Sequence, residues 1–150
     1  AGKTTLCKTL QRDINEPSNF HALESLASSV KRQTSRIEIE HGKAVITDAS
    51  DYPDFDDFMK SLYEDKPLFV MVDSIQHAVK QLTNKGMGEK QAYHHVREQL
   101  YAWKDETQGI VVLICQLNKD GGFSGPSGLL FDSDAHIHLE FDPKTGERTM

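Results

Sequence analysis

The sequence predicts an α/β fold, with helices flanking a mostly parallel central sheet. Two unbroken apolar runs, PLFVMVDS at residues 67–74 and GIVVLICQL at residues 109–117, are typical of strands buried on both faces of a parallel sheet. Segments with helical spacing of apolar residues precede and separate these runs. Because strands that alternate with helices favour parallel pairing through right-handed crossovers, we expect one layered domain of this class.

Helices are expected where apolar residues recur at intervals of three and four. The segment after the N-terminal Gly-Lys-Thr has Leu6, Leu10 and Ile14 at this spacing. Residues 54–66 and 89–107 form two further amphipathic patterns. Their expected apolar faces are Phe55, Phe58, Met59 and Leu62 in the first, and Tyr93, Val96, Leu100 and Trp103 in the second. The second face is expected in the core, with a contact between subunits as the alternative.

Three more strands and one more helix complete the expected fold. NFHAL at residues 19–23 is short enough for a strand, and KAVITDA at residues 43–49 is a β-branched run. Residues 24–36, between them, have a helical pattern. AHIHLEF at residues 135–141 alternates apolar and polar residues, which predicts another strand.

Composition indicates a folded, soluble protein. Of 150 residues, 37% are hydrophobic and 27% are charged. The net charge of −6 argues against a generally basic protein that coats nucleic acid, but it leaves a local basic loop open. No apolar run approaches the roughly 20 residues of a membrane helix, so no membrane partner is expected. Cys7 and Cys115 lie within apolar patterns and are expected to be reduced core thiols, which favours a cytoplasmic location.

The N-terminal AGKTTL resembles the end of a phosphate-binding loop, G-x-x-x-x-G-K-[ST]. In such a loop the backbone N–H groups and the lysine hold phosphates. The candidate nucleotide-binding residues are therefore Ala1, Gly2, Lys3, Thr4 and Thr5. A lone Gly-Lys-Thr is a weak signal, but a helix that begins directly after it strengthens this interpretation, because a helix N-terminus attracts phosphate.

Asp73 ends the first apolar run, at the edge of a parallel sheet where such folds bind ligands. There it could accept a water bound to Mg²⁺, while the Thr4 hydroxyl coordinates the metal directly. The alternative is a purely structural role in which Asp73 caps the following helix, and Ser74 could serve equally well as that cap.

Gln116 lies near the end of the second apolar run, next to the strand of Asp73 if the usual strand order holds. An amide at this position can reach a γ-phosphate and report it to the loop that follows. The alternative is that Gln116 only bonds to neighbouring backbone. The glycine-rich residues 118–128 are too long for a tight turn and are expected to form a functional loop.

In this order the motifs resemble those of the RecA-like P-loop ATPases, most closely the bacterial RadA (Sms) branch. VMVDSIQ resembles the Walker B segment of that branch, and NKDGGFSGPSG resembles its T-K-E-G-x-x-A-G-P stretch. The resemblance implies an ATPase that binds ATP and Mg²⁺, acting in DNA recombination and repair. It assigns the phosphates to Lys3 and the metal to Thr4 and Asp73.

Further roles follow from the same resemblance. FHALES aligns with the family segment that orients the attacking water, which nominates Glu24 as a catalytic residue beside Lys3, Asp73 and Gln116. RecA has a glutamine where RadA has a histidine at the position of Gln116, so the chain mixes the two patterns.

Two loops of the family contact single-stranded DNA, and they match LTNKGMGEKQ at residues 82–91 and the glycine-rich residues 118–128. Lys85, Lys119 and Phe123 are therefore expected to bind a single strand, by charge and by stacking. The resemblance also implies a homo-oligomer, either a ring or a filament.

Relative to the family, residues 1–150 correspond to one RecA-like ATPase core that is truncated at both ends, without the first strand and the start of the phosphate loop. Three other functions stay open: a slow signalling or scaffold ATPase like KaiC, a catalytically inactive RecA-like binding module, and a DnaB-type helicase core. A metal site at His136 and His138, with Asp132 and Asp134, is a weaker candidate, because the spacing suits a half-exposed strand.

Overall fold

The structure, a computed structural model, describes residues 3–14, 16–23, 44–116, 133–141, 145 and 148–149. Within these ranges it has four helices and six strands. The helices are α1 (Lys3–Ile14), α3 (Phe55–Asp65), α4 (Ile75–Thr83) and α5 (Glu89–Thr107). The strands are β1 (Ser18–Ala22), β2 (Ala44–Asp48), β3 (Phe69–Asp73), β4 (Ile110–Ile114), β5 (Glu140–Phe141) and β6 (Arg148–Thr149).

The predicted α/β fold with a parallel sheet is confirmed. Strands β1 to β4 form one sheet in the order β2-β1-β3-β4, and every pair in it is parallel. The strands predicted at residues 19–23, 43–49 and 67–74 are present as β1, β2 and β3. Each observed end lies one or two residues from the predicted one. The predicted helix at residues 24–36 lies outside the described residues.

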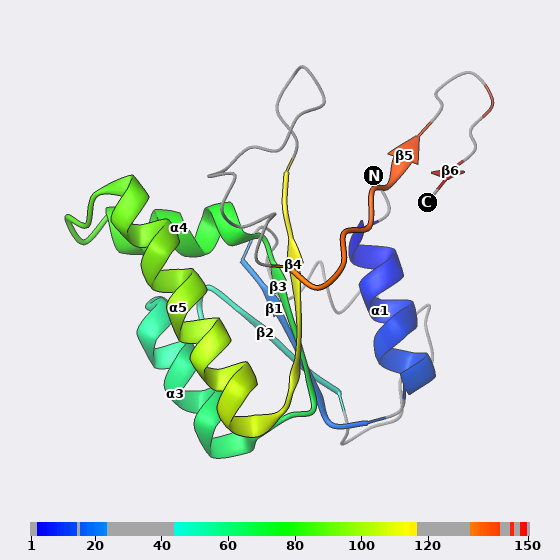
Figure 1. Cartoon of the computed structure of the whole chain (residues 1–150), viewed down its shortest axis with the longest axis horizontal. Helices are drawn as coiled ribbons and strands as arrows, with labels where there is room; N and C mark the ends of the chain where they lie inside the picture. Colours follow the sequence, from blue (N-terminus) through cyan, green and yellow to red (C-terminus); the bar gives the residue numbers. More distant parts are fainter. Residues whose placement is uncertain are drawn as a thin grey trace.

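Helices cover both faces of the sheet, as Figure 1 shows: α3, α4 and α5 lie on one side and α1 on the other. The residues of β3 alternate between the two cores. Val70 and Val72 pack with the three helices, whereas Phe69 and Met71 pack on the side of α1. This double burial explains why the strand reads as an unbroken apolar run.

The apolar face predicted for residues 89–107 is core, not a subunit contact. Tyr93, Val96, Leu100 and Trp103 are all buried. The Trp103 indole Nε1 donates a hydrogen bond of 3.1 Å to the Leu62 carbonyl of α3, so the polar atom of the ring is satisfied. A Cβ on Gly109 would lie 2.4 Å from the Trp103 ring, which explains why a glycine precedes β4.

Two strand predictions need correction. The run at residues 109–117 does form β4, but this strand lies at the edge of the described sheet, and Ile110 is 49% exposed instead of buried. Residues 135–139 have no regular secondary structure; only the last two residues of AHIHLEF form β5, which pairs with β6 in a separate antiparallel ribbon. Alternation alone does not make a strand, because a strand needs a partner that supplies backbone hydrogen bonds.

The buried face of α1 also differs from the prediction. Cys7, Lys8 and Gln11 are buried, whereas the expected apolar residues Leu6, Leu10 and Ile14 are only partly buried. The helix is therefore turned so that a lysine and a glutamine, rather than two leucines, contact the sheet. No sequence pattern predicted this orientation, because helical periodicity assumes that the apolar side faces the core.

Helix α4 was not predicted as a separate element, although its signal is present in the sequence. Ile75, Ala78, Val79 and Leu82 are buried and follow helical spacing. Among the described residues, no helix has the length and apolar character needed to cross a membrane.

A polar group is buried between β1, β2 and α3. The His21 side chain is 0% exposed and its ring stacks on Phe58, with centroids 3.9 Å apart. The Thr47 hydroxyl donates to Asn19 Oδ1 at 3.3 Å, so it accepts at 2.9 Å from the Nδ1–H of His21. The opposite nitrogen, Nε2, has no hydrogen-bond partner among the described residues. Burial lowers the pKa of His21 to about 4, although the charge of Asp48 opposes this shift.

The histidine makes folding sensitive to acid. The folded-state pKa, about 4, lies below the ordinary value of 6.5, so the unfolded chain binds the proton more readily. The stabilisation from neutral His21 is therefore complete above pH 6.5 and is lost as the pH falls toward 4. We expect the free energy of unfolding to drop by about 2–3 kcal/mol between pH 7 and 4.5 from this group.

Urea denaturation at the two pH values measures this loss. The control is His21→Gln, whose side chain does not titrate and which should show a clearly smaller drop. An equal drop in both proteins would contradict the assignment.

Candidate functional site

The carboxyl ends of the central strands form one row at one edge of the sheet. Ala22 of β1 is in register with Asp73 of β3, which is in register with Ile114 of β4. The row is extended by the Leu23 backbone N–H, which donates to the Asp73 carbonyl at 2.7 Å. Open α/β sheets bind their ligands at this edge.

Lys3 reaches this edge from the other layer. Helix α1 begins at Lys3, and the half-buried Nζ of this residue donates a hydrogen bond of 3.0 Å to the Cys115 carbonyl, directly after β4. The contact joins residues 112 positions apart in the chain. It places the ammonium group of the candidate phosphate-binding lysine at the strand ends, next to the strand that carries Asp73.

Asp73 is nearly buried, with 6% of its surface exposed, and two side chains of α1 experience its charge. Burial lowers the pKa of Lys8, and the negative charge of Asp73 partly offsets this effect. Burial raises the pKa of the Cys7 thiol, and the negative charge of Asp73 raises it further, to about 12. An ionised Asp73 is therefore favoured by Lys8, while Cys7 stays a neutral thiol.

Lys8 is the charged residue that sequence reasoning missed. It is 1% exposed, although lysine is almost never buried without a charged partner. In the sequence, only its position could have indicated this role. Lys8 lies five residues after Lys3, on a short helix that must pack against the sheet. Only the orientation of α1 shows that this side chain faces the Asp73 region.

Both cysteines are free, as predicted. Cys7 is buried and Cys115 is half-buried. Burial raises the pKa of Cys115 to about 11, and the charge of Lys3 acts in the opposite direction. Both thiols are therefore protonated at neutral pH, which makes them poor nucleophiles.

Gln116 is also at this edge, and its backbone is held by α4. Its N–H donates to the side-chain Oε1 of Gln76 at 3.3 Å. Gln76 is the last residue of the VMVDSIQ segment, and no motif in the sequence predicts a role for its side chain. The proposed sensing of a γ-phosphate by the Gln116 side chain remains a prediction.

The sequence left open whether Asp73 or Ser74 caps the helix after β3. Ser74 occupies the N-cap position of α4. Its hydroxyl makes no capping hydrogen bond to the backbone and instead bonds to His77 Nδ1 at 3.0 Å. Asp73 is the last residue of β3 and lies one position before this N-cap.

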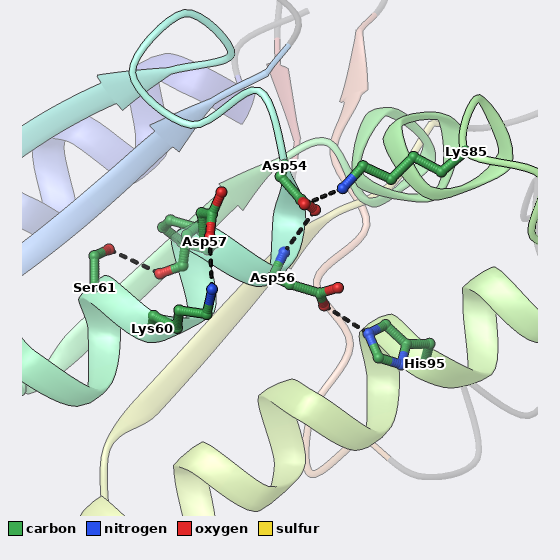
Figure 2. Close-up of polar contacts among 8 residues, drawn as sticks. Asp54, Asp56, Asp57, Lys60, Ser61, Lys85 and His95 are labelled. Atoms are coloured by element: carbon green, nitrogen blue, oxygen red, sulfur yellow. Dashed lines mark hydrogen bonds and ion pairs between the residues drawn. The ribbon is translucent and has the colours of Figure 1, made fainter.

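Lys85, a predicted DNA contact, lies in the turn between α4 and α5 and forms an ion pair with Asp54, the N-cap residue of α3. Figure 2 shows this ion pair beside a polar contact of 2.7 Å between His95 Nε2 of α5 and Asp56 Oδ1. The hydrogen bond from Lys85 lowers the pKa of the Asp54 carboxyl. A DNA phosphate would have to compete with Asp54 for this lysine.

Several predicted site residues lie outside the described part of the chain: Ala1, Gly2, Glu24, Lys119 and Phe123. The backbone of Thr4 is in the first turn of α1, and Thr5 is exposed. The structure therefore brings together Lys3, Asp73 and the backbone of Gln116, with Thr4 one residue away along α1.

The donor set at the edge suits a hard cation such as Mg²⁺, which prefers carboxylate and hydroxyl oxygens and keeps several waters. Asp73 offers a carboxylate there, and Thr4 as a second ligand stays a prediction from the sequence. The described residues, those of the sheet edge included, contain no group of three or more His, Cys, Asp or Glu side chains arranged for a metal. His136 and His138 are exposed, and Asp134 instead pairs with Lys104 at 3.0 Å.

The charges of Lys8 and Asp73 should be energetically coupled. Lys8→Met removes a buried positive charge that interacts with Asp73, so we expect a loss of about 3 kcal/mol in the free energy of unfolding. Removing both charges with Lys8→Met and Asp73→Asn should cost less than the sum of the single changes, by at least about 1 kcal/mol. Denaturant unfolding of the four proteins measures this coupling, and additive effects would show that the two charges act independently.

Comparison of the chain with protein-family models and with curated proteins finds no match.

Proposed function

We propose that this chain is the core of an ATPase, and that it binds Mg²⁺ and ATP at the carboxyl edge of its parallel sheet. The observation that carries the proposal is the contact of Lys3 Nζ with the Cys115 carbonyl, which directly follows β4, the strand paired with the strand of Asp73. A cation at a helix N-terminus and a buried carboxylate one strand away form the charge pair that a metal-bound polyphosphate requires.

In the proposed reaction Lys3 neutralises charge on the β- and γ-phosphates. Phosphoryl transfer to water depends mainly on positioning and on stabilising charge, so the protein needs fixed cations more than a covalent nucleophile. The positive charge of Lys8 interacts with Asp73 and favours a carboxylate at this position. Magnesium, when bound through Asp73 and Thr4, would supply the remaining positive charge at the transferred group. Glu24 is proposed to orient the water.

We further propose that the chain is RecA-like, closest to RadA, and couples ATP hydrolysis to remodelling of single-stranded DNA as a homo-oligomer. The support is the pair of sequence motifs VMVDSIQ and NKDGGFSGPSG, together with the all-parallel sheet on which the first of them forms a strand exit. Because Lys85 is paired with Asp54, DNA contact depends mainly on Lys119 and Phe123.

One observation favours a second candidate, a module that binds nucleotide without hydrolysing it. The buried ammonium of Lys8 supplies positive charge near Asp73, where a catalytic metal would otherwise act. If Lys8 weakens metal binding, the chain would hold nucleotide and turn it over slowly or not at all. Binding measured by calorimetry, without phosphate release, distinguishes this module from an ATPase.

Lys3→Ala tests the proposed site. Because the ammonium group is the cation assigned to the transferred phosphate, we expect turnover of Mg²⁺·ATP to fall by at least about 100-fold. Phosphate release measures the rate. Lys60→Ala is the control, since Lys60 is exposed and pairs with Asp57 on α3, and it should leave the rate unchanged. Undiminished hydrolysis in Lys3→Ala would refute the proposal.

The DNA-binding part has its own test. Lys119→Ala combined with Phe123→Ala should weaken binding to a labelled single strand, because it removes one charge and one stacking surface. The slope of log affinity against log salt should decrease in magnitude by about 0.7, the value for one phosphate contact on a single strand. Fluorescence anisotropy at several salt concentrations gives both quantities, with Lys60→Ala as the control. Unchanged affinity would exclude this loop as the DNA contact.

A further inference from the structure

One peptide group at the sheet edge is held from two sides. Lys3 Nζ of α1 donates to the carbonyl oxygen of Cys115 at 3.0 Å, and Oε1 of Gln76 in α4 accepts from the N–H of Gln116 at 3.3 Å. The carbonyl of Cys115 and the N–H of Gln116 belong to the same peptide bond. The two side chains therefore hold opposite ends of a single rigid plane.

The two partners differ in what a nucleotide would do to them. The Lys3 ammonium is charged, so its hydrogen bond to a neutral carbonyl is strong, but a phosphate attracts the same ammonium more strongly. Gln76 is uncharged, and a phosphate has no comparable attraction for its carbonyl oxygen. Both hydrogen bonds also polarise the shared peptide, so each strengthens the other.

We propose that Gln76 is a positioning residue, which retains the Cys115–Gln116 peptide at the sheet edge when Lys3 turns from the Cys115 carbonyl to a bound phosphate. The proposal rests on the proposed function, since it assumes that Lys3 binds ATP. Gln76 acts through the peptide and is not itself placed on the nucleotide.

The position of Gln76 links the strand of Asp73 to the Cys115–Gln116 peptide. Gln76 is in the first turn of α4, three residues after Asp73, so it is anchored to the strand of the candidate metal ligand. The peptide it holds is the last described part of the chain before residues 117–132. Occupancy of the nucleotide site would thus change the hydrogen bond from Lys3 and leave that from Gln116 to Gln76 in place on the Cys115–Gln116 peptide.

The chain allows the peptide to be observed alone. It contains two cysteines, and only Cys115 is followed by a glutamine, because Lys8 follows Cys7. Protein labelled with ¹³C at the cysteine carbonyls and ¹⁵N at the glutamine amides therefore gives one HNCO correlation, that of Cys115–Gln116. Its carbonyl shift reports the bond from Lys3, and its amide exchange reports the bond to Gln76.

The matched variants are Gln76→Met, which removes the acceptor at similar length, and Gln76→Glu, which keeps an acceptor oxygen. We expect amide exchange of Gln116 to be about fivefold faster in Gln76→Met than in wild type, the effect of one ordinary hydrogen bond, and to be restored in Gln76→Glu. Equal exchange in the two variants would overturn the positioning role, since a purely steric effect would not separate them.

The nucleotide step uses Mg²⁺ with adenylyl imidodiphosphate, a non-hydrolysable ATP analogue, and calorimetry on the same samples. The Cys115 carbonyl resonance should move in the direction seen in nucleotide-free Lys3→Ala, and in Gln76→Met its amide partner should broaden or shift further on binding. Binding with an unmoved carbonyl resonance would overturn this inference alone. Absence of binding would overturn it together with the proposed function.

Discussion

The in-register parallel pairing of β1, β3 and β4 is the constraint on which the other features depend. Because Ala22, Asp73 and Ile114 share one row, residues distant in the sequence meet where the strands end. A slip of one residue in β3 would exchange its two faces and move Val70 and Val72 into the wrong core. The apolar packing on both faces therefore fixes the position of the Asp73 carboxylate as well.

Buried polar groups occur on both sides of this sheet. Lys8 lies in the layer of α1, and His21 lies against α3, and each is almost completely buried. Neither contributes as much apolar packing as a leucine would, and each requires a defined protonation state. Lys8 interacts with the negative charge of Asp73, whereas the Nε2 atom of His21 has no hydrogen-bond partner among the described residues. This difference explains why the lysine fits the candidate site and the histidine is best understood as part of the core.

The sequence was informative where burial determines the residue type. The apolar run of β3 and the face that ends in Trp103 were predicted correctly, because a strand covered on both sides and a helix packed against it leave clear patterns. It was misleading for α1, where a buried charge replaces the expected apolar contact. Residues 135–139 look like a strand but are not one, since pairing partners are not encoded locally. The role of Gln76 depends on a contact 40 residues away, which no local pattern contains.

The parallel sheet also imposes an order on synthesis. Ser18 pairs with Ala44 on one side of β1 and with Phe69 on the other, and Phe69 pairs in turn with Ile110. As the chain leaves the ribosome, β1 can therefore complete its second ladder only after β3 has emerged, and the candidate site only after β4. Each addition closes a long loop, which is the step that makes such topologies slow to fold. Lys3 precedes the four strands of the described sheet in the chain and Gln116 follows them, so the site forms only when the sheet is complete.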